Sequence, residues 1–206
     1  MQLVLFTSND KFRSEIYIVI KLLENGLENL HIKKNDFTKK QLTSYINQIP
    51  EKFHSKLIIH SHYSLIFKYK LKGLHISRQF RNKKIKFKLL LFALKYFNSR
   101  INISCSCHNI DKLLDIRKHY SHVFISPIFN AEDNINTLFP LKTLENIIPQ
   151  LDFKVYATGG INLKNIHHLQ GIGLEGVGLM GSIWFNDEEQ PLTHFKESKN
   201  KLTSLS

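Results

Sequence analysis

Residues Phe153 to Asn162 read FKVYATGGIN, a short apolar run that is followed almost at once by two glycines. The run FKVYA is typical of a buried β-strand. Gly159 and Gly160 stand at its exit, where the absence of a Cβ lets the chain turn tightly or approach an anion closely. The stretch therefore predicts a strand that ends in a glycine turn, and this turn is a candidate phosphate-binding site.

The same kind of apolar run recurs along the whole chain. Including FKVYA (153–157), the runs are QLVLF (2–6), NLHIK (29–33), KLIIH (56–60), GLHIS (73–77), INISC (101–105), HVFIS (122–126) and EGVGLM (175–180). Segments with helical spacing separate most of them. One apolar stripe falls on Ile16, Val19, Ile20 and Leu23, and another on Leu89, Phe92 and Tyr96. Candidate N-cap residues lie in ND (9–10), NDFT (35–38) and HNID (108–111).

Eight strands that alternate with helices predict a parallel sheet, and eight such units close into a (β/α)8 TIM barrel. We therefore expect an α/β fold in a single domain over residues 1–206, with a C-terminal helix and polar tail from about residue 187. The alternative is an open doubly wound sheet. It is disfavoured because the fingerprint G-x-G-x-x-G is absent after the first strand, where the sequence reads FTSNDK.

The chain is strongly basic, because 29 Lys and Arg residues against 17 Asp and Glu residues give a net charge of +12. Much of the excess lies in residues 68–88, KYKLKGLHISRQFRNKKIKFK. Nucleic-acid binding and a lysine-rich solvated surface both account for this charge. The segment contains no recognisable nucleic-acid module, so we expect no specific nucleic-acid partner. The same charge suits the attraction of a phosphorylated small molecule.

The sequence also predicts a cytoplasmic protein that does not span a membrane. Its most apolar stretch, LLLFAL (89–94), is far shorter than the roughly 20 residues that cross a bilayer. The N-terminus lacks the regions of a signal peptide. Cys105 and Cys107 are too near each other to close a useful loop, so free thiols are expected, and Cys107 with His108 lacks the paired spacing of a structural zinc site. The sequence does not predict the oligomeric state.

In a barrel of this kind the chemistry lies at the C-terminal ends of the strands. Polar or small residues end or follow the apolar runs at Lys33, His60, Ser77, Ser106, His108, Pro127, Gly159, Gly160, Gly181 and Ser182. The loops after strands 7 and 8 of such barrels commonly hold a phosphate through backbone N–H groups. Because glycines occupy both loops, we predict a phosphate site at Gly159, Gly160, Gly181 and Ser182. The alternative is a pair of plain tight turns.

The successive segments LHIKKND, LIIHSHYSL, LKGLHISRQ, ISCSCHNIDKL, HVFISPIFN, VYATGGINLKNI and EGVGLMGSIW resemble the superfamily of thiamine phosphate synthase and thiazole tautomerase over nearly the whole chain. The resemblance implies a (β/α)8 barrel of thiamine biosynthesis. Synthases of the family join hydroxymethylpyrimidine diphosphate to thiazole phosphate and release pyrophosphate with the help of Mg²⁺, whereas the tautomerases need no metal. The implied partner is a phosphorylated thiazole or pyrimidine small molecule.

One half of the family's site is retained. The family holds the thiazole phosphate with an IGGI turn and with the small-residue turn after strand 8, and these match TGGIN and LMGS in this chain. The family's SxH after strand 5 matches Ser106 and His108, of which the serine is a diphosphate contact. His108 has the alternative role of a helix-start residue that packs locally.

The other half departs from the pattern. Synthases read Q-x-R-x-K after strand 2, and here His31, Lys33 and Asn35 replace the glutamine, arginine and lysine. The two Mg²⁺-binding aspartates correspond to Ser61 and Phe80, which cannot supply the anionic oxygens that the ion requires. We therefore expect no cofactor from the residues present, and no metal ligand among them.

The segment after strand 6 departs as well. The family's GPIFPTxTK becomes SPIFNAEDN, in which Ala131, Asp133 and Asn134 replace the threonine and lysine donors. The carboxylates of Glu132 and Asp133 would repel a diphosphate. In the tautomerases a proton-shuttling histidine follows strand 6, and Pro127 occupies its position here.

Three hypotheses remain open. The first is an enzyme of thiamine biosynthesis: a divergent synthase-like transferase with His31, Lys33, His60 and Ser106 as catalytic candidates, or a tautomerase in which His31 or His60 is the base. The second is a non-catalytic paralogue that binds thiazole phosphate, as the loss of the metal and diphosphate residues favours. The third, a nucleic-acid or structural role that depends on the net charge, ranks last.

Overall fold

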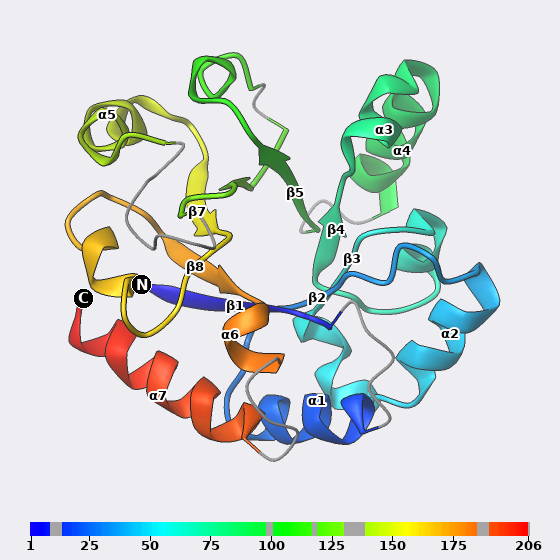
Figure 1. The fold of residues 1–206 in the computed structure, drawn as a ribbon. Helices are drawn as coiled ribbons and strands as arrows, with labels where there is room; N and C mark the ends of the chain where they lie inside the picture. Colours follow the sequence, from blue (N-terminus) through cyan, green and yellow to red (C-terminus); the bar gives the residue numbers. More distant parts are fainter. Residues whose placement is uncertain (9–13, 98–100, 117–118, 130–138, 185–189, 206) are drawn as a thin grey trace.

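A computed structural model describes residues 1–8, 14–97, 101–116, 119–129, 139–184 and 190–205 (Figure 1). Its eight parallel strands form a closed barrel in which each strand pairs with the next and β8 pairs with β1. The strands are β1 (Gln2–Phe6), β2 (Leu30–Ile32), β3 (Leu57–Ile59), β4 (Gly73–His75), β5 (Asn102–Cys107), β6 (His122–Ile125), β7 (Lys154–Thr158) and β8 (Gly176–Leu179). The predicted (β/α)8 barrel is therefore confirmed.

Helices and short 3-10 turns connect the strands. The α-helices are α1 (Glu15–Glu24), α2 (Lys39–Asn47), α3 (Arg78–Asn82), α4 (Lys84–Phe97), α5 (Leu141–Ile147), α6 (Gly181–Trp184) and α7 (Pro191–Ser204). The 3-10 turns are η1 (Glu51–Lys56), η2 (Tyr63–Phe67), η3 (Ile110–Lys112), η4 (Ile148–Gln150) and η5 (Ile166–Leu169). In the described part of the chain, no helix is long and apolar enough to cross a membrane.

The predicted helix starts have different outcomes. Thr38 in NDFT caps α2 and forms a capping box with Gln41, as this residue pattern favours. Asn109 in HNID was expected to start an α-helix, but it caps the short turn η3 instead. Its side chain accepts a hydrogen bond from the N–H of Asp111, two residues on, which is the geometry of an Asx turn. The candidate caps Asn9 and Asp10 lie outside the described residues.

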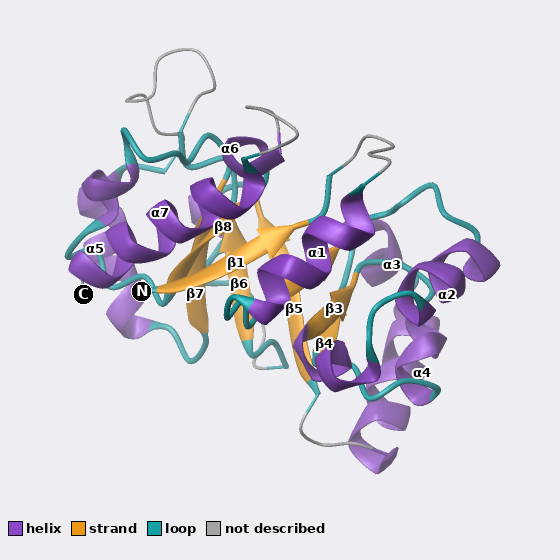
Figure 2. Ribbon diagram, turned by 90° about the horizontal axis from the view of Figure 1, so that it is seen from below, coloured by secondary structure: helices purple, strands orange, loops and turns teal. Residues whose placement is uncertain are grey.

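The main core lies between the sheet and the surrounding helices. On α1 the predicted apolar stripe packs inward, with Val19 and Leu23 fully buried. α7 runs beside α1 and buries Phe195 and Leu202, so that these two helices cover β1 (Figures 1 and 2). The two helices thus pack over β1, the strand that closes the barrel by pairing with β8.

The second predicted stripe, on α4, lies on the outer face of its helix. Leu89, Phe92 and Tyr96 are 63%, 73% and 80% exposed, whereas Leu90 and Leu94 are buried against the barrel. The exposed residues and the buried residues each have helical spacing, so α4 has two apolar faces. Periodicity locates a stripe but cannot choose between two stripes of similar composition.

The interior of the barrel contains a separate small cluster of Val4, Phe6, Phe124 and Tyr156, against which Met180 packs. Side chains alternate along a strand, and the register places Phe6 beside His31 and His75 beside Ser104. Branched aliphatic side chains usually fill this space in such barrels. Here the rings of His31 and His75 also lie in it, packed against Phe6 and Phe124.

Candidate functional site

The C-terminal ends of the strands surround a cavity of about 1040 Å³. Seven of the eight predicted site residues line it: Lys33, His60, Ser106, Gly159, Gly160, Gly181 and Ser182. The eighth, His31, is 1% exposed and lies behind the cavity wall in the barrel interior. His31 therefore cannot touch a substrate in the cavity directly.

The turn after β7 requires both of its glycines. Gly159 and Gly160 have φ angles of +89° and +70°, in the left-handed region that favours glycine. A Cβ on Gly159 would lie 2.8 Å from Pro127, and one on Gly160 would overlap the carbonyl oxygen of Phe129. The segment after β6 thus packs directly on this turn, and Phe129 N–H donates to the carbonyl oxygen of Gly159 at 3.2 Å. Packing alone accounts for the glycines, whatever ligand they meet.

Asn165, which the sequence analysis missed, fixes the shape of this turn. It is 2% exposed, its Oδ1 accepts from the N–H of Asn162 at 2.9 Å, and its Nδ2 donates to the carbonyl oxygen of Gly160 at 2.8 Å. Neither glycine N–H donates to an acceptor within the described residues. Both N–H groups are thus available to a ligand in the cavity.

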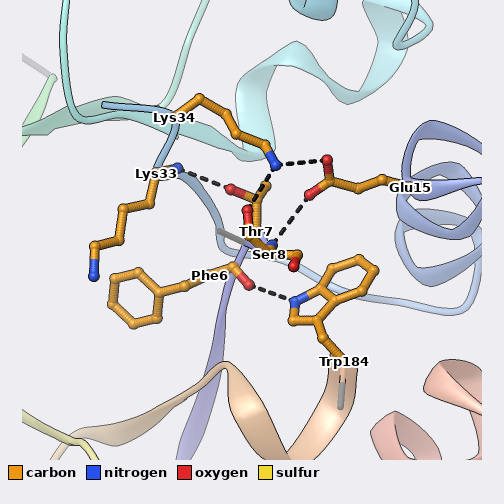
Figure 3. Close-up of polar contacts among 7 residues, drawn as sticks. All are labelled: Phe6, Thr7, Ser8, Glu15, Lys33, Lys34 and Trp184. Carbon is orange, nitrogen blue, oxygen red and sulfur yellow. Dashed lines mark hydrogen bonds and ion pairs between the residues drawn. The ribbon is translucent and has the colours of Figure 1, made fainter. Parts of the chain in front are cut away.

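The turn after β8 leads into α6. Trp184 of this helix donates its Nε1–H to the carbonyl oxygen of Phe6 at 2.7 Å, which ties the end of β8 to the end of β1 (Figure 3). The hydroxyl of Ser182 is buried and has no partner among the described residues, and the same holds for Nε2 of His194 on α7. Both residues line the cavity. Buried polar atoms are normally hydrogen-bonded, so these two unpartnered atoms, in residues that line the cavity, indicate a ligand position.

On the opposite side, adjacent lysines point in different directions (Figure 3). Lys33 extends into the cavity, while its N–H donates to Oγ1 of Thr7 at 3.0 Å. Lys34 points away and forms a buried ion pair with Glu15 at 2.8 Å, each side chain being 6% exposed. Lys34 also donates to the carbonyl oxygen of Ser8 at 2.6 Å. Burial raises the pKa of Glu15, and the bond and charge of Lys34 oppose this shift.

Arg81 of α3 supplies a second cation on this side, and the sequence analysis missed it. Its Nη2 donates to the carbonyl oxygen of Ser106 at 3.2 Å, and its Nε is buried without a partner among the described residues. Arg81 lies in the basic segment 68–88, whose charge suits a solvated surface or the attraction of a phosphorylated small molecule, but no motif singles out this residue. Arg81 reaches the cavity because α3 follows the C-terminal end of β4. The neighbouring Arg78 lines the cavity as well.

Three histidines cluster at the cavity floor, where His60 and His75 line the cavity and His31 lies behind them. Nδ1 of His31 lies 3.0 Å from Nε2 of His60, and the rings of His60 and His75 stack with centroids 4.3 Å apart. His75 also contacts Oγ of Ser104 through Nδ1 at 3.0 Å and Oγ of Ser106 through Nε2 at 3.2 Å.

Burial keeps these rings neutral. Desolvation, with a smaller effect of neighbouring cations and imidazoles, lowers the pKa of His31 and His60 well below the usual value and that of His75 to about 3. Desolvation likewise lowers the pKa of the adjacent His122 to about 4. A neutral imidazole can accept a proton or bind a metal ion, but it cannot neutralise an anion.

The positions that correspond to the family's aspartates do not contribute oxygen ligands. Neither Ser61 nor Phe80 lines the cavity, and Phe80 packs edge-to-face on Tyr63 with ring centroids 4.7 Å apart. Among the described lining residues the carboxylate is that of Glu197, on α7. Mg²⁺ prefers a nearly octahedral set of oxygens that includes carboxylates, and this donor set does not provide one. Glu132 and Asp133 lie outside the described residues.

The two cysteines are free thiols, as expected. Cys107 is buried in the main core and its thiol donates to the carbonyl oxygen of Asn109, whereas His108 lines the cavity and donates from Nδ1 to the carbonyl oxygen of Ser126 at 2.6 Å. Burial raises the pKa of Cys105 to about 12, so its thiol stays protonated.

Comparisons with known proteins agree with this architecture. The profile of a family described as thiamine monophosphate synthase matches residues 3–183. A thiamine-phosphate synthase of Dictyoglomus turgidum is 22% identical over 177 residues, which are 83% of this chain and 76% of the relative.

Solved structures show the same likeness. A thiamine phosphate pyrophosphorylase of Bacteroides thetaiotaomicron aligns with a TM-score of 0.78 and 25% identity over 98% of both chains. One from Pyrococcus furiosus aligns with a TM-score of 0.75 and 15% identity over 99% of this chain and 96% of its own.

Proposed function

The chain belongs to the thiamine monophosphate synthase family, and from this premise we propose that it joins hydroxymethylpyrimidine diphosphate to thiazole phosphate and releases pyrophosphate. The observation that supports the proposal is that two separate groups of atoms, each of a kind that can bind an anion, line one cavity. We call them the glycine side (Gly159, Gly160, Gly181 and Ser182) and the cation side (Lys33, Arg81 and Ser106).

The glycine side suits a monophosphate. Available N–H groups after β7 and the unpartnered hydroxyl of Ser182 offer several donors to one small anion. Glycine lets the backbone approach that anion without a Cβ in between. We assign the thiazole phosphate to this side.

The cation side suits the leaving diphosphate. When the bond between the pyrimidine methylene carbon and the diphosphate oxygen breaks, negative charge develops on the diphosphate and positive charge on the carbon. We assign Lys33 and Arg81, which line the cavity, to the stabilisation of the negative charge, and the thiazole nitrogen attacks the positive carbon. Because the described residues do not fit Mg²⁺, we propose that side-chain cations take over the part that this ion has in the family.

A second candidate is a protein that binds thiazole phosphate without turning it over. It is favoured by the positions of Ser61 and Phe80, neither of which lines the cavity. A tautomerase would need a base within reach of the thiazole. Here the imidazoles that line the cavity are those of His60, His75, His108 and His194, and not that of His31.

The test is a coupling assay with both substrates, in which thiamine phosphate and pyrophosphate are measured with and without added Mg²⁺. We expect turnover without added Mg²⁺. Arg81→Gln should lower it about 100-fold, the order of effect that one preorganised donor can have on the rate. Lys84→Gln, which removes an exposed nearby cation that does not line the cavity, is the matched control.

Three results would speak against the proposal. A strict requirement for Mg²⁺ would contradict the role given to Lys33 and Arg81. Binding of thiazole phosphate without turnover would favour the second candidate. Absence of both binding and turnover would exclude the two candidates together.

A further inference from the structure

We propose that His31, His60 and His75 form a binding site for one divalent transition-metal ion of the Zn²⁺ type, with an open ligand position that faces the cavity. The proposal depends on the arrangement of these three rings. It stands whether or not the coupling reaction is confirmed, because it concerns metal binding alone.

The ring nitrogens are close enough for a shared ion. One nitrogen from each histidine can be chosen so that all three lie within 4.8 Å of one another, and the pair from His31 and His60 is already 3.0 Å apart. Zn–N bonds of about 2.0–2.1 Å in a tetrahedron place ligand nitrogens about 3.3 Å apart. The nitrogen separations are therefore compatible with one shared ion after the rings rotate so that their lone pairs converge.

The surroundings orient the third ring. Ser104 is fully buried, and its hydroxyl donates to the carbonyl oxygen of Leu74 at 3.4 Å. Its Oγ is thus available to accept the Nδ1–H of His75 at 3.0 Å. This tautomer leaves the lone pair on Nε2, next to Ser106 and the cavity. Metal-binding histidines usually have their second nitrogen fixed in this way.

The chemistry of the donors selects the class of ion. Three neutral imidazoles with no carboxylate suit Zn²⁺, Co²⁺, Ni²⁺ or Cu²⁺ and do not suit Mg²⁺. When the ion enters, the proton shared by His31 and His60 moves to an outer ring nitrogen, so that both facing lone pairs bind the ion and no net proton is lost. Three histidines with a fourth open position form a site of the catalytic kind.

The open position faces the cation side. His60 and His75 line the cavity, and so do Lys33 and Arg81, whose positive charges lower the pKa of His75. A fourth ligand that is anionic, such as a phosphate oxygen, would offset the repulsion between the ion and these cations. We therefore expect inorganic phosphate or pyrophosphate to raise the metal affinity of the site.

The test is a titration of the chelator-treated, full-length protein with Co²⁺, followed by visible absorption, and with Zn²⁺, followed by calorimetry. We expect one ion per chain and the absorption bands of tetrahedral Co²⁺. Zn²⁺ should also raise the Tm, because an ion that binds the folded chain stabilises it by mass action.

Variants locate the site. His60→Asn and His75→Gln should each weaken binding by more than the roughly 10–100-fold that is typical for loss of an outer-shell partner, and Ser104→Ala should fall within that range. His122→Gln is the matched control, since His122 lies beside the cluster, with its ring centroid 6.3 Å from that of His31, but is not one of the three. It should leave the affinity unchanged.

Two outcomes would overturn the proposal. If the wild-type protein binds neither Co²⁺ nor Zn²⁺ at micromolar concentration, the three histidines form a hydrogen-bonded cluster and not a metal site. Equal binding by the wild type, His60→Asn and His75→Gln would place the ion elsewhere on the chain. Circular dichroism of each variant separates loss of the site from loss of the fold, and the wild-type titration needs no variant.

Discussion

The two sides of the cavity meet an anion with different kinds of atoms. The glycine side offers backbone N–H groups, whose position is set by the packing of the turn after β7 on Pro127 and Phe129. The cation side offers the side chains of Lys33 and Arg81, which come from different elements. A backbone site tolerates few replacements because a Cβ would overlap its neighbours. A side-chain site can keep its charge while its residues change identity and position.

Acid should have the largest effect on stability, and this effect should arise on one side of the cavity only, because the buried histidine cluster lies next to the cation side. The folded-state pKa values of His75 and His122 are about 3 and about 4, below the unfolded value near 6.5. Between these values the unfolded chain binds more protons, so the free energy of unfolding falls as the pH falls below 6.5. Each such imidazole lowers the free energy of unfolding by about 1.4 kcal/mol for each unit by which the pH falls in this range.

Urea denaturation of the metal-free protein at pH 7, 6 and 5 measures this loss. His122→Gln should flatten the pH dependence by up to about 1.4 kcal/mol per unit, whereas His167→Gln removes an exposed histidine outside the barrel and is the control. A free energy of unfolding that stays constant from pH 7 to 5 would show that the interior rings are not held neutral.

The next largest effect concerns the buried ion pair behind Lys33. Lys34→Met leaves the carboxylate of Glu15 buried without its partner, and breaking a buried pair in this way costs about 3–5 kcal/mol. Lys21→Met is the control, because the pair between Lys21 and Glu24 is 45% and 41% exposed and should cost no more than about 1 kcal/mol. Equal free energies of unfolding for the two variants would contradict the account of this network.

A glycine replacement tests the other side. Gly160→Ala combines a positive φ, which costs about 1–2 kcal/mol, with an overlap on Phe129 that adds about 1–3 kcal/mol. Gly171→Ala has a similar φ of +81°, but no heavy atom of the described residues lies within 4 Å of its added Cβ, so it should show the backbone cost alone. Chemical denaturation of both variants isolates the packing contribution. Identical costs would mean that the packing of Phe129 on the turn is not the reason why residue 160 is a glycine.

The sequence was sufficient to predict the barrel, since each apolar run became a strand and the order of the strands follows from their alternation with helices. It could not predict which face of α4 packs, because Leu89 and Leu90 belong to two apolar stripes of equal quality. It also missed Arg81 and His194, which reach the cavity from helices that follow the strand ends by several residues or more. His31 was correctly located on a strand, but its inward direction depends on register, which periodicity alone does not fix.

The central claim is that the two sides bind different anions independently. Calorimetry tests it directly, with thiazole phosphate and inorganic pyrophosphate titrated separately into the wild type, Ser182→Ala, Arg81→Gln and the control Lys84→Gln. Hydrogen bonds to charged groups contribute about 1.5–3 kcal/mol, or about 10–100-fold in affinity. Ser182→Ala should weaken thiazole phosphate alone and Arg81→Gln should weaken pyrophosphate alone. Equal losses of both ligands in both variants would contradict the claim.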